Sequence, residues 1–160
     1  MTISVGQTLP GATLHRMGAN GPEDITVKDL TAGRKVVIFA VPGAFTPTCH
    51  SAHVPSFVRT RQALTAKGID EVVCVAVNDV HVMKAWDQAT GAEAAGITML
   101  ADDGSFTQAL GLSFDVPAIA LMGRSKRYAM MVEDGVVKVY HPETGRGCEI
   151  SGGEAMLESL

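Results

Sequence analysis

The sequence predicts a single α/β domain in which a central mixed β-sheet is flanked by helices. The runs at residues 36–41 and 71–77 are almost continuously apolar, which is typical of strands that are buried on both faces. Segments with helical spacing follow both runs, and Asp134-Gly135 is a strong hairpin signal near the C-terminus. A length of 160 residues suits one domain with its own core, so we expect the domain to cover residues 1–160.

The first part of the chain contains the strand and the helix that matter most for function. In order, the patterns predict an edge strand or hairpin within 1–22, a helical turn at 26–30, the buried strand at 36–41 and a helix from Cys49 to a cap at 67–68. Pro55 removes one hydrogen bond inside this helix, so the sequence predicts a kink there.

The second part of the chain continues the alternation of strand and helix. The patterns predict a strand at 71–77, a helix at 80–89, a strand at 97–100, a helix at 106–110, paired strands at 127–133 and 136–141, and a terminal helix from residue 154. Residues 117–122 are apolar but bounded by Pro and Gly, and they receive no assignment. A glycine-rich loop is expected at 145–147, directly before Cys148.

Composition narrows the partners and the compartment. The formal charge of −4 and the absence of a basic run argue against nucleic acid as the main partner. The sequence starts without a secretory pattern, and no apolar run approaches the ~18 residues of a membrane span, so we expect no membrane association. Three cysteines do not resemble a secreted disulfide framework. A reducing compartment, by default the cytoplasm, is the expectation.

Cys49 is the strongest candidate for a chemically active residue. The buried strand ends at Pro42-Gly43, a short turn follows, and Cys49 falls in the first turn of a helix. Free backbone N–H groups and the positive end of the helix dipole favour a thiolate there over a thiol. Thr46 lies three residues earlier, where its hydroxyl could reach the sulfur. The alternative, a small buried hydrophobic cysteine, is the commoner role of cysteine in general.

The segment PGAFTPTC, residues 42–49, resembles the active-site signature of the peroxiredoxin family. With HVPSFV after it, the segment is most similar to the type II, or peroxiredoxin-5, subgroup. Further blocks match in the same order: VVCVAVND, LADDGSFTQALGL and SKRYAMMVEDGVVK. The resemblance implies a thioredoxin-like fold and a thiol-dependent peroxidase that reduces hydrogen peroxide and alkyl hydroperoxides, with no cofactor and no metal.

The resemblance also implies roles for individual residues. Cys49 would be the peroxidatic cysteine, which becomes a sulfenic acid, and Thr46 would orient the peroxide. Pro42 would shield the site, and Arg127 would polarise it, with Arg124 as a supporting or surface charge. Cleavage of an O–O bond by a thiolate places negative charge on the leaving oxygen. The Arg127 fork and the backbone N–H groups of Thr48 and Cys49 are suitable donors for that charge.

The thiol that would reduce the sulfenic acid stays open at the level of sequence. An external thiol carried by glutaredoxin, glutathione or thioredoxin is preferred. Cys148, in a loop expected to be exposed, comes next, and Cys74 comes last because its strand should be buried. A disulfide between Cys49 and Cys74 would need local unfolding if their Cα atoms were more than ~7 Å apart.

Other side chains near Cys49 have alternative roles. His53, one turn after Cys49, would bias the pKa of Cys49, steer a reductant or be a partly exposed helix histidine. We expect His50 to face solvent, Trp86 to serve packing or an interface, and Phe45 to line the pocket or a contact in a homodimer, which the resemblance implies.

Three other activities use the same residues. A Cys–His hydrolase built from Cys49 and His53 lacks a third, orienting group. A zinc site on the same pair lacks a second pair of ligands. A thiol sensor would need the same activated cysteine, and only turnover of peroxide with added thiol separates it from a peroxidase.

Overall fold

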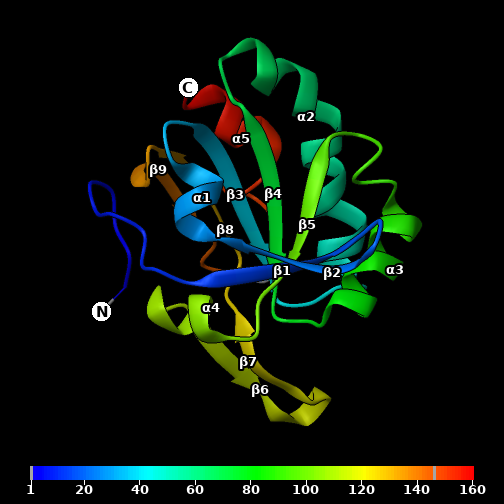
Figure 1. The fold of residues 1–160 in the computed structure, drawn as a ribbon. Helices are drawn as coiled ribbons and strands as arrows, with labels where there is room; N and C mark the ends of the chain where they lie inside the picture. The colour runs from blue at the N-terminus through cyan, green and yellow to red at the C-terminus, as the bar shows by residue number, and fades with distance from the viewer. Residues whose placement is uncertain (1, 146) are drawn as a thin grey trace.

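The computed structural model describes residues 2–145 and 147–160 and has a seven-stranded mixed sheet at its centre (Figure 1). In spatial order the strands are β2 (Gly21–Thr26), β1 (Thr13–Gly18), β5 (Ile97–Ala101), β4 (Glu71–Ala76), β3 (Lys35–Val41), β8 (Tyr128–Glu133) and β9 (Val136–Pro142). The central strands β5, β4 and β3 are parallel, and the pairs outside them are antiparallel. The predicted α/β class is therefore confirmed, and the N-terminal hairpin lies at the sheet edge as predicted.

Strand β3 explains why a continuously apolar run is needed at the centre of the sheet. Successive side chains of a strand point to opposite faces. In β3, Val37, Phe39 and Val41 join the apolar cluster on one face, and the residues between them join the cluster on the other. Every residue from Val36 to Val41 is fully buried. The predicted burial on both faces is confirmed.

Helices cover both faces of the sheet. On the face of Phe39 lie α2 (Val54–Ala66), α3 (Val80–Thr90) and α5 (Gly153–Glu158), and on the other lie α1 (Val27–Thr31) and α4 (Ser105–Ala109). Figure 1 shows α2 and α5 together on one side and α1 on the opposite side. The helix that carries Cys49 is therefore packed between the sheet and the C-terminal end of the chain.

Pro55 leads to a local change of helix type. The turn η1 (Cys49–His53) is π-helical, and the N–H of Val54 bonds to the carbonyl of Cys49. Pro55 has no N–H to donate, and a widened turn before it accommodates the missing bond. The disturbance that the sequence predicts at Pro55 thus falls on the turn that contains Cys49.

The unassigned residues 117–122 belong to a small hairpin outside the main sheet. It consists of β6 (Ser113–Val116), the 3-10 turn η2 (Pro117–Ile119) and β7 (Leu121–Ser125), and it projects from one end of the sheet (Figure 1). Ile119 is 65% exposed and Met122 is 56% exposed. Apolar residues that are not buried give no usable periodicity, which is why the pattern could not be read.

The C-terminal hairpin β8–β9 forms at the predicted place. Asp134 and Gly135 both have positive φ, 49° and 80°, as the tight turn between twisted strands requires. At the open end of this hairpin, Tyr128 pairs with Pro142, so Arg127 and Glu143 lie side by side just beyond it. Of the loop predicted at 145–147, residue 146 lies outside the described residues.

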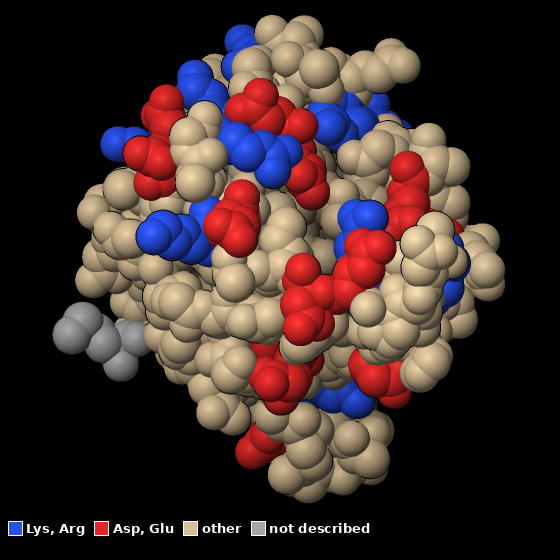
Figure 2. Space-filling model, in the orientation of Figure 1, with Lys and Arg blue, Asp and Glu red and all other residues tan. Residues whose placement is uncertain are grey.

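Acidic and basic side chains share one face of the molecule. On the face drawn in Figure 2, acidic and basic side chains are interspersed rather than separated by sign. Within residues 2–145 and 147–160, none of the helices has the length and apolar character needed to cross a membrane.

Candidate functional site

The turn between β3 and Cys49 is held in place by bonds from several directions. Asn78, just beyond β4, accepts the N–H of Ala44 at 2.9 Å. Phe45 has a φ of 65°, a left-handed conformation that costs a bulky residue about 1–2 kcal/mol. No sequence pattern marked Asn78 as part of the site. Its position just beyond a strand was nevertheless a signal, because the carboxyl ends of neighbouring parallel strands meet at one edge of a sheet.

Thr46 and Cys49 are in direct contact. The Thr46 Oγ1 lies 2.7 Å from the Cys49 Sγ and 2.8 Å from the carbonyl oxygen of Gly43. A hydroxyl has one proton, so it serves one of these acceptors at a time. When Cys49 is a thiolate, the proton points to sulfur. When Cys49 is a thiol, its own S–H can point to Oγ1 and leave the Thr46 proton for Gly43.

Arg127 supplies a cation to the same sulfur from a distant part of the chain. It lies just before β8, is 7% exposed, and places Nη2 3.1 Å from the Cys49 Sγ. A buried guanidinium beside sulfur favours the thiolate over the neutral thiol. Arg124 instead donates to the carbonyl of Pro42 at 3.4 Å. Of the two arginines weighed from the sequence, the structure brings only Arg127 to Cys49.

His53 contacts Arg127 rather than Cys49. Its Nε2 donates to the carbonyl of Ser151 at 2.8 Å, and its Nδ1 accepts from Arg127 Nη1 at 2.9 Å. The side chain is fully buried, so the alternative of a partly exposed histidine is wrong. Burial, followed by the charge of Arg127, lowers the pKa of His53 to about 3. His53 is therefore neutral, with its proton on Nε2, and it orients the guanidinium.

His50, Trp86 and Phe45 form a second group beside the helix start. Trp86 is buried, as expected for packing, and its Nε1 donates to His50 Nδ1 at 3.0 Å. The ring of His50 also stacks on Phe45, with 5.9 Å between ring centroids. The expectation that His50 simply faces solvent is therefore wrong, because the half-buried ring has two protein partners. Phe45 remains 49% exposed.

A cleft of about 1020 Å³ gives access to the site. Pro42, Thr46, Thr48 and Arg127 line its inner end, and the apolar side chains of the β6–β7 hairpin line much of the rest. Phe45 is not part of this lining. Thr48 and Cys49 lie in the first helical turn, because His50 is the first residue whose N–H bonds back to Thr46. Their N–H groups are free for a ligand in the cleft.

The two other cysteines lie in different surroundings, and all three thiols are free. Cys74 is fully buried in β4, and burial raises its pKa well above the usual value. Cys148 is half-buried, and its Sγ lies 3.8 Å from the hydroxyl of Ser151. Burial also raises the pKa of Cys148, against a smaller opposing effect of Ser151 and Arg127.

The geometry argues against two of the alternatives, the Cys–His hydrolase and the zinc site. In a Cys–His hydrolase the imidazole must accept the proton of the nucleophile, but His53 Nδ1 already accepts from Arg127, and its Nε2 faces Ser151. Among the described residues, no three or more His, Cys, Asp or Glu side chains gather in a way that could hold a metal ion. What the residues around Cys49 can do is hold a thiolate and donate hydrogen bonds to an oxygen ligand.

Comparisons with known proteins agree on one family. A sequence model of the family described as Redoxin matches residues 4–157. "Peroxiredoxin-2E-2, chloroplastic" of rice is 46% identical over 99% of this chain and 73% of its own, and "Peroxiredoxin-2E, chloroplastic" of Arabidopsis thaliana is 43% identical over 99% and 70%. The crystal structure of reduced Prx3 from Vibrio vulnificus in complex with hydrogen peroxide is 48% identical, covers 99% of both chains and superposes with a TM-score of 0.92. The predicted thioredoxin-like fold is thereby confirmed.

The comparisons contradict the expected cytoplasmic location. Both of these plant relatives are named as chloroplastic proteins, not as cytoplasmic ones. The expectation rested on few cysteines and no secretory pattern. Both features indicate a reducing compartment, and they do not distinguish the cytoplasm from the interior of an organelle.

Proposed function

This chain belongs to the peroxiredoxin family and is a thiol-dependent peroxidase, and we propose that Cys49 is the thiolate that attacks the peroxide. One observation carries the proposal. The Cys49 Sγ lies 2.7 Å from the Thr46 hydroxyl and 3.1 Å from the Arg127 guanidinium, and it stands in the first turn of a helix. Neither Cys74 nor Cys148 has a cation and a hydroxyl within hydrogen-bond distance among the described residues.

The proposed reaction is an in-line displacement. The Cys49 thiolate attacks one oxygen of the hydroperoxide, the S–O bond forms, and the O–O bond breaks. Cys49 becomes a sulfenic acid, and the second oxygen leaves as an alkoxide or hydroxide and takes up a proton. Arg127 and the N–H groups of Thr48 and Cys49 in the first helical turn are the donors proposed for this negative charge, because preorganised donors accelerate a reaction most where charge develops.

Thr46 and Pro42 complete the proposed site. As the S–O bond forms, the sulfur loses its negative charge, so the Thr46 hydroxyl can turn its one proton from the sulfur to the oxygen under attack. Pro42 lines the inner end of the cleft without an N–H that could hold water there. The apolar outer cleft suits the carbon chain of an alkyl hydroperoxide, so we propose alkyl hydroperoxides as substrates alongside hydrogen peroxide.

For the return to the thiol, we propose an external reductant, either glutaredoxin with glutathione or thioredoxin. Cys148 is the second candidate, since it is half-buried in a loop near the helix that carries Cys49. Cys74 is the last candidate, because it is fully enclosed in the central strand β4. A thiol without exposure has to wait for local unfolding before it can reach a sulfenic acid.

We further propose that the protein is of type II and forms a homodimer. The segment at residues 42–49 supports the subgroup, as do the names of the 2E relatives. Phe45 supports an interface near the site: its ring is half exposed and its backbone conformation is fixed. Exposed aromatic side chains on a rigid turn are common centres of interfaces.

Peroxide consumption with added thiol tests the function. The wild-type protein should consume many equivalents of hydrogen peroxide per chain with dithiothreitol, thioredoxin or glutaredoxin and glutathione, and Cys49→Ser should consume none above the thiol-only background. A sensor would stop after one equivalent. A Cys49→Ser protein with wild-type turnover would overturn the assignment of Cys49.

A further inference from the structure

The chain segment before α5 is bonded directly to the group that orients Arg127. The carbonyl of Ser151 accepts the Nε2 proton of His53 at 2.8 Å, across 98 residues of sequence. This bond fixes the tautomer of His53, and the tautomer decides whether Nδ1 can accept from Arg127. The position of one backbone carbonyl therefore controls the orientation of the guanidinium at Cys49.

Glu143 holds this carbonyl in place. Its Oε2 accepts the N–H groups of Glu149, Ile150 and Ser151 at 3.0, 3.1 and 3.1 Å, and the Ser151 hydroxyl at 2.7 Å. Partial burial raises the pKa of Glu143, but these hydrogen bonds outweigh it and leave the pKa below the usual value. One carboxylate thus ties down three consecutive residues that end at Ser151.

The hairpin places Glu143 next to the residue that it would influence. Tyr128 pairs with Pro142 at the open end of β8–β9, and the N–H of Glu143 bonds to the carbonyl of Arg127 at 3.0 Å. Arg127 is thereby linked to Glu143 twice. One link runs through its own backbone, and the other runs from its side chain through His53 and Ser151.

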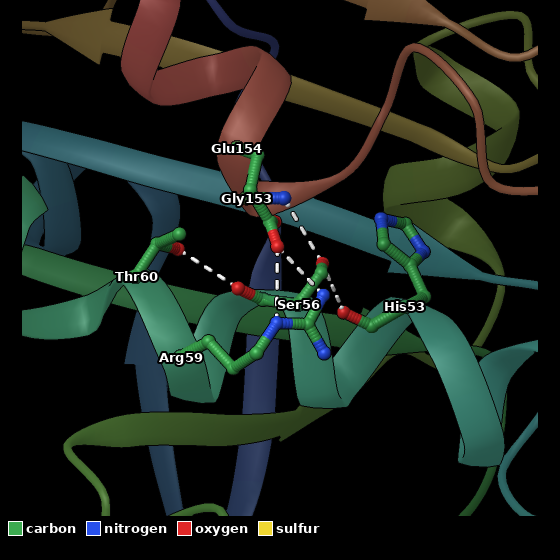
Figure 3. Close-up of polar contacts among 6 residues, drawn as sticks. All are labelled: His53, Ser56, Arg59, Thr60, Gly153 and Glu154. Atoms are coloured by element: carbon green, nitrogen blue, oxygen red, sulfur yellow. Dashed lines mark hydrogen bonds and ion pairs between the residues drawn. The ribbon is translucent and has the colours of Figure 1, made fainter.

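The other end of the segment is anchored on the helix that carries His53. The N–H of Gly153 donates to Ser56 Oγ at 2.9 Å, and Ser56 Oγ donates to the carbonyl of His53 at 2.6 Å. Figure 3 shows these contacts, with the ring of His53 directed toward the chain that leads into α5. A Cβ on Gly153 would collide with Thr60 Oγ1 and with the backbone carbonyl of Ser56, so this close approach requires glycine.

We propose that Glu143 is a positioning residue for peroxide reduction, acting through the Ser151 carbonyl and His53 on the Arg127 guanidinium. The proposal rests on the proposed function of Cys49 and Arg127. Arg127 has four side-chain torsions, and contact with sulfur alone does not fix the plane of its fork. The bond from Nη1 to His53 Nδ1 fixes that plane, so that Nη2 points at the Cys49 Sγ.

The first test measures the oxidation of Cys49 itself. Rapid mixing with hydrogen peroxide gives the rate constant, with the fluorescence of the single tryptophan, Trp86, as the signal. Glu143→Ala should lower it about tenfold, because a small displacement of a donor is costly. Glu143→Gln, which keeps one acceptor oxygen, should lower it less.

Glu154→Gln is the matched control. It removes the same charge from the same part of the chain, but Glu154 pairs with the exposed Arg59 and does not bond to Ser151 (Figure 3). Its rate constant for Cys49 oxidation should equal that of the wild type. If Glu143→Ala does not fold, as thermal unfolding would reveal, Glu143→Gln carries the test. Wild-type values in the folded Glu143 variants would overturn the proposal.

A double-mutant cycle separates positioning from general stability. If Glu143 acts through His53, then adding Glu143→Ala to His53→Gln should change the rate constant by less than about twofold, although each substitution alone lowers it. Full additivity of the two effects would overturn the proposal. The proposed function itself is tested by the wild-type protein. If peroxide does not oxidise Cys49 in the wild type, the proposed function is refuted, whatever the variants show.

Discussion

Cys49 and Cys74 are equally buried, and both belong to the apolar cluster on the same face of the sheet. Their surroundings nevertheless differ. Cys74 pairs with Phe39 and Met99 in the centre of the sheet, where burial raises its pKa. The sulfur of Cys49 instead meets a hydroxyl and a guanidinium. The two thiols therefore differ not in exposure but in the polar groups that the fold brings to the sulfur.

Those polar groups come from two sources of different range. The first turn of the helix and Thr46 are supplied within a few residues of Cys49. Arg127 lies 78 residues from Cys49 in the sequence, and the β8–β9 hairpin and His53 orient it. Each kind of support can be removed separately, so the contrast between the two cysteines can be tested one donor at a time.

Replacing Cys49 should have the largest effect, and replacing Cys74 is its comparison. Cys49→Ser should reduce peroxide consumption to the background rate, because a hydroxyl in the same place is a far weaker nucleophile. Cys74→Ala should keep wild-type turnover and lose stability only through the small cavity it leaves, measured as a lower Tm. A folded Cys74→Ala protein without activity would contradict the view that Cys74 only fills the core.

Removing the distant donor comes next. Arg127→Gln should lower the rate constant for Cys49 oxidation by about 10²–10³, the usual loss for one preorganised charged donor. Arg127→Lys should not restore the rate, because an ammonium group cannot reach His53 and Cys49 with the same planar fork. Arg124→Gln is the control, since Arg124 bonds only weakly to the carbonyl of Pro42. An equal loss in both variants would assign the effect to net charge.

Removing the local donor should have a somewhat smaller effect. Thr46→Val keeps the shape of the side chain but leaves the Cys49 Sγ without its hydroxyl, and the rate constant should fall about a hundredfold. Thr46→Ser restores the hydroxyl and should recover most of the rate. A slow Thr46→Ser protein would mean that the methyl group, which packs the turn, matters more than the hydrogen bond.

The difference in range also explains what the sequence could predict. The buried strand, the turn and the helix start lie within one continuous stretch, so their patterns predict a thiolate site at Cys49 with Thr46 beside it. The contact of Arg127 with Cys49 agrees with the role that the family resemblance implied. The partners of His53 could not be read, because they depend on the register of β8–β9 and on the approach of α5. Patterns along a chain do not contain such registers.

The pH dependence of stability tests whether the histidine that orients Arg127, His53, is neutral in the folded protein. Its pKa is about 3 in the folded protein and near 6.5 when unfolded, so between these values the unfolded chain binds a proton that the native state excludes. Stability should therefore fall as the pH decreases from 6.5, by up to about 1.4 kcal/mol per pH unit and about 2 kcal/mol at pH 5. Urea unfolding at several pH values measures this slope.

Two variants control that measurement. His53→Gln should lose most of the slope, whereas His15→Gln, at a surface histidine paired with Asp24, should keep it. The same slope in wild type and His53→Gln would mean that other groups cause the acid sensitivity.

Cys148 completes the comparison, because it is half-buried whereas the other two thiols are fully buried, and among the described residues Ser151 is the hydrogen-bond partner of its sulfur. If an external thiol resets Cys49, then Cys148→Ser should change turnover with glutaredoxin and glutathione by less than about twofold, which is the smallest effect expected here. The loop itself should stay in place, since Glu143 holds it through Ser151 and the two residues before it. The measurement is steady-state peroxide consumption with each reductant in turn. Normal oxidation of Cys49 followed by loss of turnover in Cys148→Ser would instead make Cys148 the thiol that resolves the sulfenic acid, and the loop held by Glu143 would then have to open in every cycle.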